Sequence, residues 1–215
     1  MSFRAVFLLM AMSLCPSVSL AQETGSHLTG KEPARIDHEG EFTGSEAREI
    51  LDAYASCLVK RRYMIVQKAL SMPENSAEQY KAIVNLSQSE CLVNGSLQFS
   101  AKVIRASLYK ALVQKDFGRK LPVFRSSVQP SVGRDSLVRD FSACIVHREP
   151  AAVHRVLMAR AGSKQETASL TAIFPALGEC IDPASKLAFG KIELIGLLAE
   201  SFYREAVASK SESAG

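Results

Sequence analysis

Ser56-Cys57-Leu58-Val59 returns 87 residues later as Ala143-Cys144-Ile145-Val146, a small residue followed by a cysteine and two aliphatic residues. With two short insertions the match extends through both halves of the chain. Further pairs at matching positions are Arg61 with Arg148, Leu70 with Leu157, Cys91 with Cys180, Phe99 with Phe189 and Leu108 with Leu198. Solenoid repeats have shorter periods, about 20–50 residues. The pattern therefore predicts a duplicated helical subdomain, the alternative being two unrelated segments that share an amphipathic pattern.

Apolar residues recur at spacings of three and four on both sides of each cysteine, and 47% of the residues are hydrophobic without a single Trp. We expect an all-α fold of two tandem, quasi-equivalent four-helix repeats over residues 45–115 and 132–208. Helix breaks are expected near Arg62 and at Pro150, and Pro175 is expected to kink or shorten its helix. The fourth helix of each repeat carries Ala106 or Gly196, small residues that permit close helix approach. These two helices are predicted to join the halves.

The segments outside the repeats have distinct compositions. Residues 1–21 combine Arg4, an apolar run and Ser19-Leu20-Ala21, which is typical of a cleaved signal peptide. An uncleaved anchor is the alternative, but the apolar run is too short to span a bilayer, and no later segment is expected to span one. Residues 22–44 are predicted to be a disordered acidic arm, 116–131 a linker and 209–215 a disordered tail.

Four of the five cysteines follow the predicted cleavage site. An even number in an oxidising compartment indicates disulfides, with three pairings available. Because each repeat holds one pair at matching places, Cys57 with Cys91 and Cys144 with Cys180 is the economical choice. Each would contribute about 4 kcal/mol to stability in the chain-entropy model. Bridges between the repeats and free buried thiols are the alternatives.

Charge is divided unevenly along the chain. Residues 22–54 hold three basic and eight acidic side chains, whereas residues 55–125 hold twelve and four. The basic first repeat offers a candidate face for an anionic partner such as anionic lipid, lipopolysaccharide or an acidic protein, the alternative being a solvated face that only confers solubility. Nucleic acid is a poor partner for a secreted chain. The candidate face comprises Lys60, Arg61, Arg62, Lys102, Arg105, Lys110, Lys115, Arg119 and Lys120.

Motifs that carry chemistry are lacking in the sequence. There is no nucleophile elbow, zinc-protease helix, phosphate loop or dinucleotide fingerprint. His147 and His154 are seven residues apart, about 10 Å along one helix and too far to share a metal. We therefore predict a secreted or periplasmic binding module with no catalytic residues, metal or cofactor. The alternative is an all-helical hydrolase, which convergent carboxylates or a site containing both histidines would favour.

One stretch of the first repeat resembles known sequences. Its residues are Glu90-Cys91-Leu92, Gly95, Leu97, Phe99, then Ser107 to Leu112, and Asp116-Phe117-Gly118. They look like uncharacterised secreted proteins of Gram-negative bacteria that carry a similar cysteine-containing unit. The resemblance covers most of the first repeat and, more weakly, the second. It implies a periplasmic location and no activity, because that family has none assigned.

Overall fold

The computed structural model describes residues 44–74, 76–87, 91–92, 99–118, 120–124, 134–181 and 189–212. Within these ranges the secondary structure is helical, with no strand, so the all-α prediction is confirmed. The helices are α1 (Gly44–Arg61), α2 (Tyr63–Ser71), α3 (Ala77–Ser87), α4 (Ala101–Asp116), α5 (Arg134–Arg148), α6 (Pro150–Met158), α7 (Lys164–Cys180) and α8 (Lys191–Glu212). None of these described helices combines the length and apolar character needed to cross a bilayer. The predicted signal peptide and the arm up to residue 43 lie outside the described residues.

The two predicted helix breaks are present. Arg62 separates α1 from α2 with φ −131° and ψ 38°, and Glu149 separates α5 from α6 with φ −127° and ψ 51°. Pro150 occupies the first turn of α6, where its missing N–H costs no hydrogen bond. A nearly identical backbone conformation therefore recurs 87 residues apart.

Serine caps begin the third helix on each side. The Ser76 hydroxyl accepts a hydrogen bond from the backbone N–H of Gln79 at 3.1 Å, and the Ser163 hydroxyl accepts one from Glu166 at 3.1 Å. Each cap contributes about 1 kcal/mol by satisfying a donor that the helix leaves open. The capped residues, Gln79 and Glu166, are both buried.

Two helix ends differ from the sequence prediction. Pro175 does not shorten α7, which continues to Cys180. The burial of Ile173 and Ala176 on either side of the proline, together with the disulfide at Cys180, offsets the missing backbone hydrogen bond. α8 continues to Glu212, past residue 208 where the disordered tail was expected, because Ser209 is still buried in the last turns.

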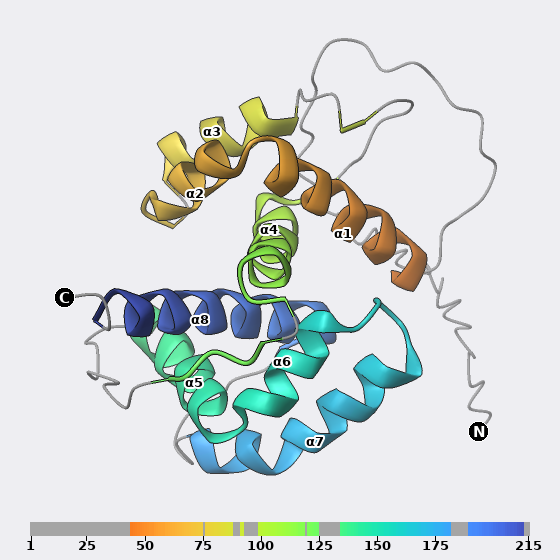
Figure 1. The fold of residues 1–215 in the computed structure, drawn as a ribbon, viewed down its shortest axis with the longest axis vertical. Coiled ribbons are helices and arrows are strands. Elements are labelled where there is room, and N and C mark those ends of the chain that lie inside the picture. The colour runs from red at the N-terminus through yellow and green to blue at the C-terminus, as the bar shows by residue number, and fades with distance from the viewer. Residues whose placement is uncertain are drawn as a thin grey trace, which may run out of the picture.

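α4 and α8 form the centre of the fold. Their mutual contact is the most extensive between any two described helices, so the prediction that they join the halves is confirmed. In Figure 1, α4 is seen nearly end-on above α8, with α1 to α3 on one side and α5 to α7 on the other. A single apolar core runs through both sides. Its fully buried members include Leu58, Leu108, Leu112, Ile145, Leu157, Leu198 and Phe202.

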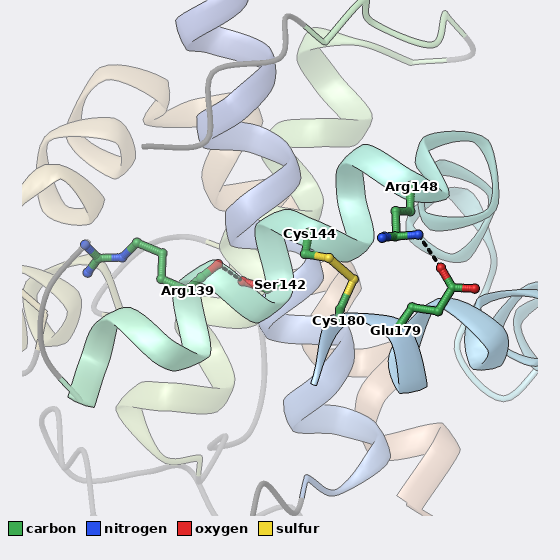
Figure 2. The surroundings of a disulfide bond; sticks show 6 residues. All are labelled: Arg139, Ser142, Cys144, Arg148, Glu179 and Cys180. Atoms are coloured by element: carbon green, nitrogen blue, oxygen red, sulfur yellow. Dashed lines mark hydrogen bonds and ion pairs between the residues drawn. A yellow bond between two sulfur atoms is a disulfide. The ribbon is translucent and has the colours of Figure 1, made fainter. Parts of the chain in front are cut away.

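Both predicted disulfides are present. Cys57 in α1 is bonded to Cys91, with Cα atoms 5.7 Å apart, and Cys144 in α5 is bonded to Cys180 at the end of α7, with Cα atoms 5.8 Å apart. Figure 2 shows the second bond and the Arg148–Glu179 ion pair beside it. Each bond attaches the third-helix region of one half to its first helix.

Aromatic contacts stand at corresponding places in the two halves. Tyr54 packs against Phe99 with ring centroids 6.2 Å apart, and Phe141 packs against Phe189 with centroids 5.4 Å apart. In each case a ring on the first helix meets a ring that directly precedes the fourth helix. These pairs help to hold the long helices α1 and α5 against α4 and α8.

Candidate functional site

A cleft of about 630 Å³ lies where α4 and α8 meet the beginning of α1; we call it the central cleft. Its apolar lining comes from both halves and comprises Val103, Ala106, Ile192, Gly196 and Leu197. Its charged lining comprises Arg48, Glu74, Lys102, Arg105, Lys191, Glu193 and Glu200. Ligand pockets in proteins are typically about 300–1,000 Å³ and largely apolar, with a few placed polar groups. The central cleft has this size and mixture.

A second hollow of about 330 Å³, the side cleft, adjoins the first along α8. Both are lined by Glu74, Lys102, Glu193, Leu197 and Glu200. The side cleft adds Arg139 from α5 and Arg204 from α8. Together the two clefts make one groove between the halves.

Arg105 is the most constrained charge in this groove, because its side chain is only 5% exposed. Its Nε donates to Glu200 at 3.1 Å, its Nη2 is paired with the same carboxylate, and Glu74 lies 3.9 Å away. Its Nη1 is buried without a hydrogen-bond partner in the part of the chain that the structure describes. Arg105 was predicted to lie on an exposed basic face, and that prediction is wrong because α4 buries this side against α8.

Lys110 also departs from the predicted face, because α4 buries this side chain against α1. Its Nζ, on a side chain 5% exposed, donates to Asp52 at 2.6 Å, and Ser107 donates to the other oxygen of that carboxylate at 2.9 Å. The pair attaches α4 to α1 inside the first half. Its charge is neutralised there and is not available to a partner.

The other described members of the predicted basic face lie either at the rim of the central cleft or near the junction of α1 and α2. Lys102 lies at the rim of the central cleft and pairs with Glu193 across the junction of the halves. Lys115 stacks over the Tyr63 ring, with Nζ 3.8 Å from the centroid. Arg119 lies outside the described residues. The members that remain exposed near the junction of α1 and α2 and the end of α4 are Lys60, Arg61, Arg62, Lys115 and Lys120.

Glu166 forms a buried ionic cluster at the other end of the central cleft. The carboxylate is fully buried and accepts hydrogen bonds from Arg48 at 3.2 Å, from Lys191 at 2.8 Å and from the Gly162 N–H at 3.1 Å. Burial by itself would raise the pKa of Glu166, but the hydrogen bonds from Arg48 and Lys191 outweigh it and hold the pKa at about 2. The cluster therefore links α1, α7 and α8.

A polar network that the sequence did not indicate joins α2, α4 and α8. Asp116 accepts hydrogen bonds from Tyr63 at 2.7 Å and from Tyr203 at 2.9 Å, while Gln67 donates to both hydroxyls. Burial raises the pKa of Tyr203 above its ordinary value, so the phenol keeps its proton and donates it to the carboxylate. Tyr63 and Gln67 are one helical turn apart, but no spacing rule relates them to Asp116 or Tyr203, which come from two other helices.

The two candidate histidines have separate partners. His147 lies 3.1 Å from Glu205, whereas the Nε2 of His154 donates to the Gly118 carbonyl at 2.9 Å and its ring stacks on Phe202. Burial lowers the pKa of His154, so this ring is neutral in the core. Neither histidine lines the central or the side cleft. Among the described residues, no group of three or more His, Cys, Asp or Glu is placed to hold a metal ion.

The comparisons with known proteins identify no relative. No protein-family model matches the chain, and no match was found among curated proteins or solved structures. The resemblance to secreted Gram-negative proteins therefore stays a prediction.

Proposed function

We propose that the protein is an extracytoplasmic binding module that holds a small amphipathic ligand in the central cleft. The two disulfides, one at a corresponding position in each half, favour an oxidising compartment, where such bonds persist. The observation that carries the proposal is the cleft itself, with an apolar floor from α4 and α8 and charged groups around it. Such a surface can bury the apolar body of a ligand while its polar end meets the rim.

The competing function is hydrolysis, for which three cleft carboxylates are relevant. Glu200 accepts from Arg105 and lies 2.9 Å from Arg204, Glu193 pairs with Lys102, and Glu74 lies 3.9 Å from Arg105. A general base must be free to take a proton from water or substrate. Because cations of the protein already engage these carboxylates, the arrangement favours binding over hydrolysis.

The test uses 1-decanol, an uncharged amphiphile, as the probe in titration calorimetry. We expect saturable binding to the wild type and about tenfold weaker binding to Ile192→Asp, equivalent to about 1.4 kcal/mol. Ile192 is 42% exposed, so the substitution places a charge in the apolar floor without disturbing the core. The matched control is Met64→Asp, because Met64 is also the second residue of its helix and is 73% exposed but lies outside the cleft. Equal weakening in both variants would reject the cleft as the site.

We further propose that the halves are quasi-equivalent repeats over residues 45–115 and 132–208. Supporting observations are the backbone conformations at Arg62 and Glu149, the caps at Ser76 and Ser163, the two disulfides and the two aromatic pairs. Met72 and Ala159 end the second helices with similar angles, φ −67° and ψ 155° against φ −75° and ψ 149°. In an experimental structure, superposing one range on the other should align the four helices in order and direction. A different order would disprove the duplication.

A second candidate surface is the corner between α1 and α2. Met64 is 73% exposed and Ile65 is 50% exposed, directly after the basic run Lys60, Arg61 and Arg62. Exposed apolar side chains next to basic ones are typical of surfaces that rest on anionic membranes. Of the partners predicted from the charge distribution, anionic lipid fits this corner best.

A further inference from the structure

The charges of the groove indicate what kind of ligand it accepts. Counting the lining of both clefts, the cations are Arg48, Lys102, Arg105, Arg139, Lys191 and Arg204, and the carboxylates are Glu74, Glu193, Glu200 and Glu205. Adding the buried Glu166, which is paired with Arg48 and Lys191, still leaves one more cation than carboxylates. Among the described residues, the lining of the groove therefore carries an unbalanced positive charge.

Arg139 carries that unbalanced charge. It is an exposed residue of α5 that lines the side cleft, and its guanidinium makes no ion pair or hydrogen bond with the described residues. In Figure 2 the Arg139 side chain extends away from the disulfide and from the Arg148–Glu179 pair. A planar guanidinium with its donors free is suited to bind a carboxylate or phosphate through two parallel hydrogen bonds.

A comparison with the first half explains why Arg139 has no partner among the described residues. In the proposed repeat, Asp52 and Lys110 correspond to Arg139 and Glu200, so the charges of this pair are exchanged. Asp52 and Lys110 bond to each other at 2.6 Å. Glu200, however, is already held by Arg105 and Arg204. Glu200 is therefore not left to pair with Arg139 in the way that Asp52 pairs with Lys110.

Arg105 is a second arginine of the groove with an unused hydrogen-bond donor among the described residues. Its side chain lines the central cleft, it is 95% buried, and its Nη1 has no hydrogen-bond partner among the described residues. A buried N–H group without an acceptor costs free energy, and an acceptor that reaches it recovers that cost. Arg105 lines the central cleft and Arg139 lines the side cleft, and Glu74 and Glu200 line both.

We infer that the ligand is an anionic amphiphile whose acidic group binds Arg105 and Arg139 where the two clefts join, while its apolar chain lies on Val103, Ala106, Ile192 and Leu197. This inference rests on the proposed function, since it names the ligand class for the same site. It predicts discrimination by charge at constant chain length. An alkyl carboxylate should bind better than the alcohol, and an alkylammonium should bind worst.

The experiment compares decanoate, 1-decanol and decyltrimethylammonium by titration calorimetry at pH 7.5, each below its aggregation limit. Wild-type protein should bind decanoate about tenfold more tightly than decanol. Arg139→Gln should weaken decanoate binding about fivefold and leave decanol binding unchanged. The control is Arg155→Gln, since Arg155 is an exposed α6 arginine that lines neither cleft. It should alter neither affinity.

Arg105→Lys tests the buried donor separately. Lysine keeps the positive charge beside Glu200 but removes Nη1, so decanoate binding should fall about tenfold while decanol binding is retained. A near-ultraviolet circular dichroism spectrum checks that the Arg105→Lys variant is folded. If it is not folded, the binding measurements on Arg139→Gln test the inference. Equal binding of decanol and decanoate by the wild type, or equal loss of both in Arg139→Gln, would overturn the inference and leave the proposed function standing. Failure of all three probes to bind the wild type would reject the proposed function itself.

Discussion

Gly196 of α8 lies directly against Ala106 of α4: a Cβ atom placed on Gly196 would stand only 2.6 Å from the Ala106 Cβ. Two Cβ atoms in non-bonded contact do not approach that closely without displacement, so the two helix backbones are as near as their side chains permit. The two residues occupy matching positions in the fourth helices of the proposed repeats. Equivalent residues of the two proposed repeats thus meet at the contact between α4 and α8.

Gly196→Ala should therefore destabilise the protein, although alanine is the better helix former. The clash with Ala106 is expected to cost about 1–3 kcal/mol, and the gain in helix propensity offsets up to about 1 kcal/mol. Chemical denaturation measures the difference in unfolding free energy. Gly178→Ala in α7 is the control, because a Cβ there meets nothing within 4 Å, and it should be neutral or stabilising. A Gly196→Ala variant as stable as Gly178→Ala would contradict the close packing.

Removal of one disulfide should lower the unfolding free energy by about 4 kcal/mol. Cys144 and Cys180 close a loop with a sequence separation of 36, and the bond reduces the conformational entropy of the unfolded chain. The variant is Cys144→Ala with Cys180→Ala, and its counterpart is Cys57→Ala with Cys91→Ala, which should cost a similar amount. A peptide map under non-reducing conditions checks the pairing in the parent protein. Free thiols or a bridge between the halves would disprove it.

Glu166 should make stability depend on pH in the acidic range. Its pKa is about 2 in the folded protein against an ordinary value of 4.5, so its contribution, about 3 kcal/mol, is complete above pH 4.5 and is lost as pH falls towards 2. Urea denaturation at pH 7, 4.5 and 3 should show the wild type losing more stability than Glu166→Gln. Glu78→Gln changes an exposed glutamate in the first turn of α3 and serves as the matched control. If Glu166→Gln follows the wild-type pH profile, the buried cluster does not contribute as described.

The corner between α1 and α2 should bind anionic vesicles in a salt-dependent way. Cosedimentation with phosphatidylglycerol vesicles should be strong at low salt and weaken at physiological salt, where the Debye length is about 8 Å. Met64→Asp and Lys60→Glu should both reduce vesicle binding severalfold. The first removes an apolar side chain that would insert into the membrane, and the second removes a positive charge that attracts anionic lipid. Ile192→Asp, which alters the central cleft, should bind as the wild type does. Absence of binding at low salt would leave the corner as a solvated surface.

The sequence by itself determined the helical class, the two cysteine pairs and the breaks at Arg62 and Pro150. These features depend on local periodicity, on turn chemistry and on a pattern repeated at a fixed offset. The contact of α4 with α8 was also predictable, because Ala106 and Gly196 are small residues within otherwise bulky helices. Each of these signals is contained in a short stretch of chain.

Only the tertiary structure decided which charges line the groove between the halves. Lys102, Arg105 and Lys110 lie on one helix, but α4 is covered by α1 on one side and by α8 on the other, so Arg105 and Lys110 are buried and Lys102 is exposed. Glu166 likewise becomes a buried link only because Arg48 and Lys191 arrive from distant segments. Helical spacing predicts which residues share one face of a helix. Which other helix packs against that face depends on contacts between residues about a hundred positions apart. The physical reason is that burial of a charge is settled by the packing of whole helices and not by the propensity of any one of them.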